Sequence, residues 1–273
     1  MTTTRFAPSP TGELHLGHAY AAKVGHDLAR KHNGQFLLRH EDIDSSRVRE
    51  IYYSQIEEDL RWLGLNWDGE PLRQSSRQDA YREALGILKQ QGLVYPCFCT
   101  RKDIQQSLSA PHGAAENIYP GICRDLPKDQ SAQRIAAGEA HAWRFDSKKS
   151  VALHGELNFE DLRFGKTRVN PDTNGDAVLA RKDIGIAYHL AVVVDDAFQN
   201  ITHVTRGDDL LESTHIHRQL QAVLGFPEPT YLHHPCICDE TGKRLAKRDD
   251  ARSIQSLRMA GQSKEDVFAM IED

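Results

Sequence analysis

The sequence predicts an α/β fold built on a doubly wound parallel sheet. Up to Gly92, strand-like and helix-like patterns follow in the order strand, helix, strand, helix, helix, which is how such a sheet begins. Later, the stretch from Tyr188 to Asp196 contains a nearly continuous apolar run, as is typical of a strand that is covered on both faces. The 273 residues suffice for one large domain or two smaller ones with a substantial core.

The first strand-like segment begins near Arg5 and passes through a turn rich in proline and glycine into His15-Leu16-Gly17-His18. Apolar residues then recur at helical spacing, at Leu16, Tyr20, Val24 and Leu28. A loop that opens onto a helix N-terminus offers unpaired N–H groups and the positive end of the helix dipole to an anion. Gly17 lets a flat base or a phosphate approach the backbone. For these four residues alone, a simple surface turn is the alternative.

Residues 35–44 have the pattern of a buried strand whose carboxyl end turns abruptly acidic. Because the carboxyl ends of parallel strands face the ligand crevice, we expect Glu41 to face a ligand. Asp42 and Asp44 are better explained as structural residues that cap the following helix. Arg206 ends a later strand in the same way, and a cation and an anion in one crevice suit a zwitterion such as an amino acid. A direct salt bridge between Arg206 and Glu41 is the structural alternative.

Helical spacing predicts one helix that stops at Gly64, another that ends near Gly92, and a third from Leu211 to Leu224. The chain is expected to end in about two short helices, one of them started by Ser263 with Asp266 as its capping partner.

Changes in composition divide the chain into four expected parts. A passage with cysteines, glycines and prolines begins at residue 94, and the strand and helix pattern resumes after residue 172. The parts are residues 1–93, the first half of the sheet domain; 94–172, an inserted subdomain; 173–235, the second half of the sheet domain; and 236–273, a basic loop with a short helical tail.

Five cysteines are present, at positions 97, 99, 123, 236 and 238. Four of them form two Cys-x-Cys pairs and one is single. This odd number argues against a secreted disulfide framework and for a reducing compartment, so we expect a cytoplasmic protein. No apolar run is long enough to span a membrane, and the first residues lack the pattern of a signal peptide. Cys236 and Cys238 point to the same face of a strand and are interpreted as packing residues.

The thiols of Cys97, Cys99 and Cys123 supply three ligands for a zinc ion. The spacing leaves the fourth ligand open. His112 is the usual kind of ligand and Tyr119 an unusual one, and a cysteine from the pair at positions 236 and 238 is a third possibility. Buried cysteines that serve only as small apolar residues are the alternative to a metal site.

A basic loop, Lys243-Arg244-Leu-Ala-Lys247-Arg248, follows a glycine turn near the end of the chain. Such a run is usually a solvated surface, but beside a nucleotide it clamps phosphates as a mobile lid. The net charge of -5 and the pI near 6.3 give no general affinity for nucleic acid, so any RNA partner needs a local basic face.

His15-Leu-Gly-His18 and Arg244-Leu-Ala-Lys247-Arg248 resemble the two signatures of class I aminoacyl-tRNA synthetases. Four further stretches, in the correct order along the chain, resemble glutamyl-tRNA synthetase motifs. They begin at Arg5, Leu38, Tyr188 and Arg206, and read RFAPSPTG, LRHEDID, YHLAVVVDD and RGDDL. Only a short tail follows the lysine loop, which resembles the truncated glutamyl-Q tRNA(Asp) synthetase family and implies that no anticodon-binding domain is present.

This resemblance implies ATP-dependent activation of L-glutamate without tRNA, followed by transfer of glutamate to the queuosine base at the wobble position of tRNA(Asp). It implies a monomeric, Rossmann-type enzyme with no membrane partner, ATP with Mg²⁺ as substrate, and one structural zinc ion. The catalytic residues implied are His15, His18 and Lys247, with Gly17 added for ATP binding. The glutamate site implied comprises Arg5, Phe6, Ala7, Pro8, Ser9, Glu41, Tyr188 and Arg206. The zinc ligands implied are Cys97, Cys99, Tyr119 and Cys123.

One position departs from the family pattern. The lysine loop usually has serine before its second lysine, and here it has Ala246. The loss of a hydroxyl donor leaves Lys247 for the phosphate contact. Three other functions compete with the transfer to queuosine: ordinary charging of the tRNA 3′ end, transfer of nucleotides to a small molecule, and RNA binding by a non-catalytic paralogue.

Overall fold

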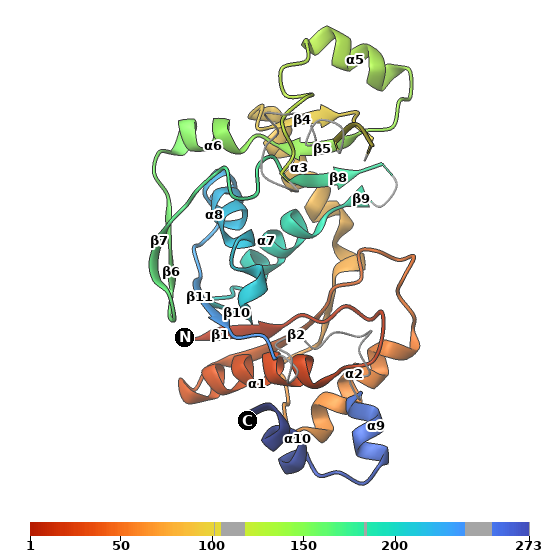
Figure 1. Cartoon of the computed structure of the whole chain (residues 1–273), viewed down its shortest axis with the longest axis vertical. Helices are drawn as coiled ribbons and strands as arrows, with labels where there is room; N and C mark the ends of the chain where they lie inside the picture. Colours follow the sequence, from red (N-terminus) through yellow and green to blue (C-terminus); the bar gives the residue numbers. More distant parts are fainter. Residues whose placement is uncertain (101, 105–117, 183–184, 238–252, 273) are drawn as a thin grey trace.

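The computed structural model describes residues 1–100, 102–104, 118–182, 185–237 and 253–272 of the chain (Figure 1). The first part alternates strands and helices in the order expected from the sequence. Its elements are β1 (Thr3–Phe6), α1 (Leu16–Lys31), β2 (Gln35–His40), α2 (Ile51–Trp62), β3 (Leu72–Arg73), the 3-10 turn η1 (Gln74–Arg77) and α3 (Gln78–Gln90). The strands pair in the order β1-β2-β3 and all run parallel. Gly64 and Gly92, which follow α2 and α3, have the positive φ angles typical of glycines that end helices.

The later strands extend the parallel sheet on the other side of β1. They are β10 (His203–Gly207), β11 (Thr230–His234), β6 (Asn158–Asp161) and β7 (Gly165–Arg168), in the order β10-β11-β6-β7. All but β7 run parallel. β10 lies beside β1, and the N–H of Thr202 donates to the carbonyl of Thr3 at 3.0 Å. The prediction of a Rossmann-like parallel sheet is therefore confirmed.

A separate antiparallel sheet lies at the top of Figure 1, next to helix α5 (Lys128–Ala136). Its strands are β4 (Val94–Cys97), β5 (Ala142–Phe145), β8 (Val178–Arg181) and β9 (Gly185–Ile186). The pairing of β8 with β5 carries this sheet past residue 172, the end expected for the insertion. Between these strands, α6 (Ser147–His154) leads to the β6–β7 hairpin, which joins the parallel sheet instead.

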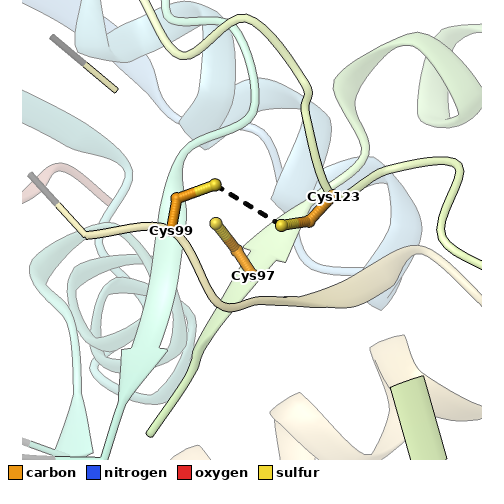
Figure 2. Close-up of side chains that lie close together, drawn as sticks. All are labelled: Cys97, Cys99 and Cys123. Carbon is orange, nitrogen blue, oxygen red and sulfur yellow. Dashed lines mark hydrogen bonds between the residues drawn. The ribbon is translucent and has the colours of Figure 1, made fainter. Parts of the chain in front are cut away.

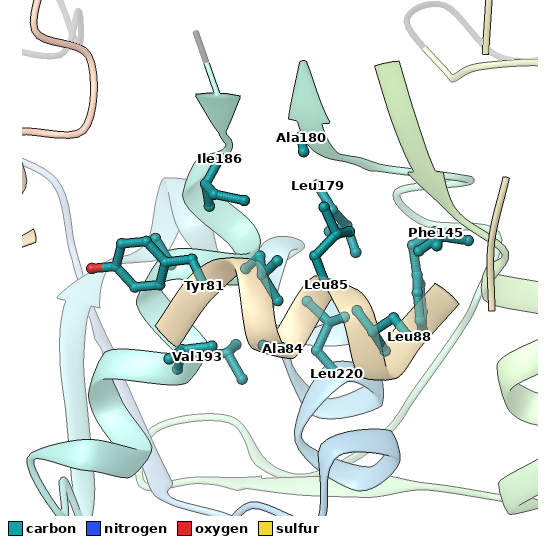
Figure 3. Close-up of a cluster of buried hydrophobic side chains, with 14 of the residues drawn as sticks. Tyr81, Ala84, Leu85, Leu88, Phe145, Leu179, Ala180, Ile186, Val193 and Leu220 are labelled. Atoms are coloured by element: carbon teal, nitrogen blue, oxygen red, sulfur yellow. The ribbon is translucent and has the colours of Figure 1, made fainter. Parts of the chain in front are cut away.

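The prediction of a strand from Tyr188 to Asp196 is wrong, because this segment is helix α7 (Tyr188–Phe198). Its residues from Leu190 to Asp196 are all buried. A helix that is enclosed on all sides has the same unbroken apolar run as a buried strand, so periodicity alone does not separate the two. Figure 3 shows the packing that encloses it: Tyr81, Leu85 and Leu88 of α3 lie in one core with Val193 of α7 and Leu220 of α8 (Ser213–Leu224).

The chain ends in α9 (Ile254–Met259) and α10 (Lys264–Glu272), as expected. At the start of α10 the Asp266 carboxylate accepts from the Ser263 N–H at 2.8 Å, and the Ser263 hydroxyl accepts from the Asp266 N–H at 3.1 Å. This reciprocal pair confirms the predicted capping box. Within the described parts of the chain, no helix combines the length and the apolar character needed to cross a membrane.

Candidate active site

The turn at His15 fixes two imidazole rings at the start of α1. His15 is the residue before the helix, and its N–H donates to Nδ1 of His18 at 3.2 Å. The two ring centroids are 3.8 Å apart. A Cβ at position 17 would lie 3.2 Å from Cε1 of His15, so a glycine lets this ring lie against the backbone. Because Nδ1 of His18 accepts a hydrogen bond, a neutral His18 carries its proton on Nε2.

A cavity of about 120 Å³ opens beside this turn. One wall is formed by His15, Gly17 and His18, and the other by Gly207 at the end of β10 and by the segment from His234 to Ile237. The cavity therefore lies at the carboxyl ends of β10 and β11, where ligands bind in parallel sheets.

The predicted lysine loop, including Lys247 and Ala246, lies outside the described residues. The residues on either side of this stretch both lie at the turn. Ile237 lines the cavity, and Ser253 forms a β-bridge with His15 while the N–H of Ile254 donates to the Leu14 carbonyl at 2.8 Å.

A second cavity, of about 260 Å³, contains part of the predicted glutamate site. Ser9, Glu41 and Tyr188 line it, as does Asp44, and Ile186 and Ala187 close one side. Burial raises the pKa of Glu41, and the nearby Arg39 and Arg5 guanidinium groups act in the opposite direction. Glu41 lines this cavity just after the end of β2, and its contact with a ligand stays a prediction. The other predicted residues of this site, Arg5, Phe6, Ala7, Pro8 and Arg206, are not among those that line it.

Asp42 is structural, as expected, but it does not cap the following helix, since the residue before α2 is Glu50. It accepts from the Tyr53 hydroxyl at 2.6 Å and from the Ser75 N–H at 2.6 Å. These bonds join the end of β2 to α2 and to η1, so they hold the neighbouring Glu41 at the cavity.

Two buried carboxylates on α7 organise the site behind this cavity. Asp196 binds Arg5 through Nε at 2.9 Å and Arg39 through Nη1 at 2.7 Å, and all three side chains are buried. Asp195 accepts from the Tyr81 hydroxyl at 2.7 Å and pairs with Arg77 at 2.6 Å. The sequence prediction missed Arg39 and gave the two aspartates no role. The sequence does contain a signal for their role, because two adjacent aspartates at the end of a buried apolar run need buried partners.

Arg206 lies at the carboxyl end of β10, as expected, but it makes no salt bridge with Glu41. Its Nε donates to Nε2 of His233 at 3.0 Å, and its Nη2 donates to the Thr214 hydroxyl at 2.7 Å. Its Nη1 lies 3.1 Å from Nδ1 of His217. The ion-pair partner of Glu41 is Arg39, at 3.5 Å. The structural alternative stated for Arg206 and Glu41 is therefore wrong.

The three predicted cysteine ligands come together in the inserted subdomain (Figure 2). The Sγ atoms of Cys97, Cys99 and Cys123 all lie within 4.8 Å of one another, and those of Cys99 and Cys123 are 3.5 Å apart. The Tyr119 hydroxyl is 3.2 Å from the Cys97 sulfur and 3.5 Å from the Cys99 sulfur. Cys236 instead contacts Asp209, at 3.2 Å.

These four side chains fit a tetrahedral metal site. Zn–S bonds of about 2.3 Å in a tetrahedron place two sulfur ligands roughly 3.8 Å apart, close to the separation of Cys99 and Cys123. The Tyr119 oxygen lies at a similar distance from two of the sulfurs, and it accepts a hydrogen bond from the Cys123 N–H at 2.9 Å. The competing ligands His112 and Cys238 lie outside the described residues.

Comparison with known proteins agrees with this geometry. The model of the class I tRNA synthetases (E and Q), catalytic domain, matches residues 1–272. A glutamyl-Q tRNA(Asp) synthetase from Rhodobacter capsulatus is 49% identical, over 98% of this chain and 99% of the relative. One from Symbiobacterium thermophilum is 43% identical, over 98% of this chain and 84% of the relative. The chain belongs to the glutamyl-Q tRNA(Asp) synthetase family of class I tRNA synthetases.

The fold of this family member is also that of a full-length relative. The crystal structure of a glutamate-tRNA synthetase from Elizabethkingia anophelis superposes with a TM-score of 0.78 at 31% identity, and the match covers 91% of this chain. The chain spans 53% of that structure.

Proposed function

We propose that this protein activates L-glutamate with ATP in the absence of tRNA and then transfers it to the queuosine base at the wobble position of tRNA(Asp). The observation that carries the proposal is the pair of cavities at one edge of the parallel sheet, one beside His15 and His18, the other beside Glu41 and Tyr188. Both cavities lie at the carboxyl ends of strands of this sheet, where ligands bind in parallel α/β folds. Two relatives that are 49% and 43% identical to this chain are named glutamyl-Q tRNA(Asp) synthetases.

ATP would occupy the cavity at the turn, with its adenine near Gly17. His15 and His18 would donate hydrogen bonds to phosphate oxygens from the helix N-terminus, and Lys247 of the predicted lysine loop would supply a cation to the same phosphates. Mg²⁺ bridges phosphate oxygens when bound and needs few protein ligands.

The glutamate α-carboxylate attacks the α-phosphorus of ATP, a new P–O bond forms, and pyrophosphate leaves. Such a reaction is promoted by positioning and by stabilisation of charge, so the protein need not supply a nucleophile. Glu41, which lines the second cavity, would bind the substrate ammonium group. Arg206, with Arg5 as the second cation, attracts the carboxylates.

The cysteine cluster would bind one structural zinc ion through Cys97, Cys99, Tyr119 and Cys123. Four protein ligands leave no open position for a substrate, which is the arrangement of structural rather than catalytic zinc. The metal would hold β4 to the segment around Cys123, in a part of the chain with few other buried apolar residues.

The experiment that tests the activation step is glutamate-dependent ATP–pyrophosphate exchange with no RNA present. We expect exchange with glutamate and much less with glutamine. Exchange that requires added tRNA would favour an ordinary glutamate-tRNA synthetase, the type of enzyme whose fold this chain shares.

A further inference from the structure

Arg206 is held in an unusual way for a buried arginine. All three of its guanidinium nitrogens contact side chains, and the partners are Thr214, His217 and His233. Within the described parts of the chain, Arg206 makes no ion pair, whereas Arg5 and Arg39 both bind Asp196. A buried charge normally has a charged partner, because desolvation is otherwise costly.

The hydrogen bonds of the two histidines fix them as neutral acceptors. Nδ1 of His233 lies 2.6 Å from the Asp161 carboxylate and donates its proton there, so that Nε2 has a lone pair for Arg206. Nδ1 of His217 accepts from Arg206, and Nε2 of His217 donates to Nδ1 of His189 at 3.0 Å. Burial and the charge of Arg206 lower the pKa of both His217 and His233, which keeps both rings uncharged at neutral pH.

Among the described residues, the charged side chains near the second cavity, the proposed glutamate site, therefore leave the positive charge of Arg206 without a charged partner. Arg5, Arg39, Glu41 and Asp196 form a network with equal numbers of positive and negative groups. Asp195 likewise pairs with Arg77. The Asp161 carboxylate binds Nδ1 of His233, so it is separated from Arg206 by the His233 ring.

The positive charge of Arg206 acts on Tyr188, which lines the second cavity. The Tyr188 ring lines the cavity and lies 5.6 Å from the ring of His217, the partner of Arg206. Burial raises the pKa of the Tyr188 hydroxyl, and the largest opposing effect is the positive charge of Arg206. Free glutamate has a net charge of one negative unit at neutral pH, and glutamine has none.

We propose that His217 and His233 are positioning residues that hold Arg206 through neutral acceptors, so that the substrate's extra carboxylate, rather than a protein carboxylate, balances its charge. This inference rests on the proposed activation of glutamate. If the two rings were charged, they would change the charge that the substrate meets. Their neutrality, as well as their shape, therefore helps the site to select glutamate over glutamine.

The test uses two variants that differ in charge alone. In His217→Asn and His217→Asp a side-chain oxygen replaces Nδ1 as the acceptor for Arg206, and only the aspartate adds a negative charge. We expect a KM for glutamate in pyrophosphate exchange that is at least roughly tenfold higher in H217D than in H217N, as for loss of a charged partner. The KM for ATP should be equal in the two variants, and the preference for glutamate over glutamine should fall in H217D alone.

A purely structural role predicts the opposite order, since aspartate gives Arg206 a stronger partner. Equal glutamate KM values in the two variants, or a lower value in H217D, would overturn the inference. If either protein fails to fold, His233→Gln and His233→Glu form a second matched pair, because both place an oxygen near Nε2 of His233. Absence of glutamate-dependent exchange in the wild-type protein would instead refute the proposed function, so the two failures are distinguishable.

Discussion

The carboxylate of Asp196 on α7 accepts a hydrogen bond from Nε of Arg5 on β1, at 2.9 Å. The same carboxylate binds Arg39 on β2 at 2.7 Å, so one buried acid ties the helix to two neighbouring strands. This contact gives Arg5 an internal counter-ion. Arg5 and Arg206 are both proposed to attract the glutamate carboxylates, and this contact distinguishes them. Among the described residues, Arg206 has only uncharged partners.

Removal of the Asp196 carboxylate should destabilise the whole fold. In Asp196→Ala, Arg5 loses its charged partner and Arg39 keeps only the longer pair with Glu41, so we expect the free energy of unfolding to fall by about 3–5 kcal/mol. Urea denaturation followed by circular dichroism measures this change. Asp27→Ala is the matched control, since the exposed pair of Asp27 with Lys23 should contribute at most ~1 kcal/mol. Equal losses in the two variants would show that the Asp196 network is not important for stability.

Replacement of Arg206 should affect activity far more than folding. Arg206→Ala removes the positive charge that is left for the substrate, and kcat/KM for glutamate in pyrophosphate exchange should fall by a factor that corresponds to roughly 2–5 kcal/mol. The three neutral partners can then bond to water. Exchange at the wild-type rate in a folded Arg206→Ala protein would remove Arg206 from the glutamate site.

The cysteine cluster should bind one zinc ion per chain in protein purified without added metal. Cys123→Ala should lose the metal and lower the unfolding temperature, because a structural zinc contributes directly to folding. Cys236→Ala is the control, since Cys236 contacts Asp209 away from the cluster. Elemental analysis of both proteins gives the result. A well-folded wild-type protein with no zinc would exclude the proposed site.

The buried histidines predict that the fold weakens in mild acid. Burial lowers the pKa of His189 to about 4, and burial and Arg206 lower that of His233 to about 4, both from ordinary values near 6.5. Between these two pH values the unfolded chain binds more protons than the folded one, so the free energy of unfolding should fall as the pH falls from about 6.5 to 4. His189→Gln should make this dependence shallower, whereas the exposed His154→Gln should not. An identical pH dependence in both variants would contradict the assignment.

The sequence predicted the first half of the sheet well, because its helices and strands have distinct periodicities and end at glycines such as Gly64 and Gly92. It failed at α7, where burial on every side removes the periodic signal that distinguishes a helix from a strand. The sequence did not predict that β8 pairs with β5, since strand pairing depends on contacts distant in sequence.

The site was only partly predictable. Glu41 and the histidines of the turn stand at the ends of recognisable elements, so their places follow from the topology of the sheet. The roles of Asp195 and Asp196 depend on buried partners more than a hundred residues away, and that of His217 depends on contacts with Arg206 and with His189 on a different helix. No local pattern contains that information.

The most direct test of the central claim is transfer of labelled glutamate to queuosine-containing tRNA(Asp) that lacks its 3′-terminal adenosine. Removal of this nucleoside takes away the hydroxyl groups that ordinary charging requires and leaves the queuosine base unchanged. We expect labelled glutamate at the wobble nucleoside of the shortened tRNA. Labelling only of tRNA with an intact 3′ end would contradict the account.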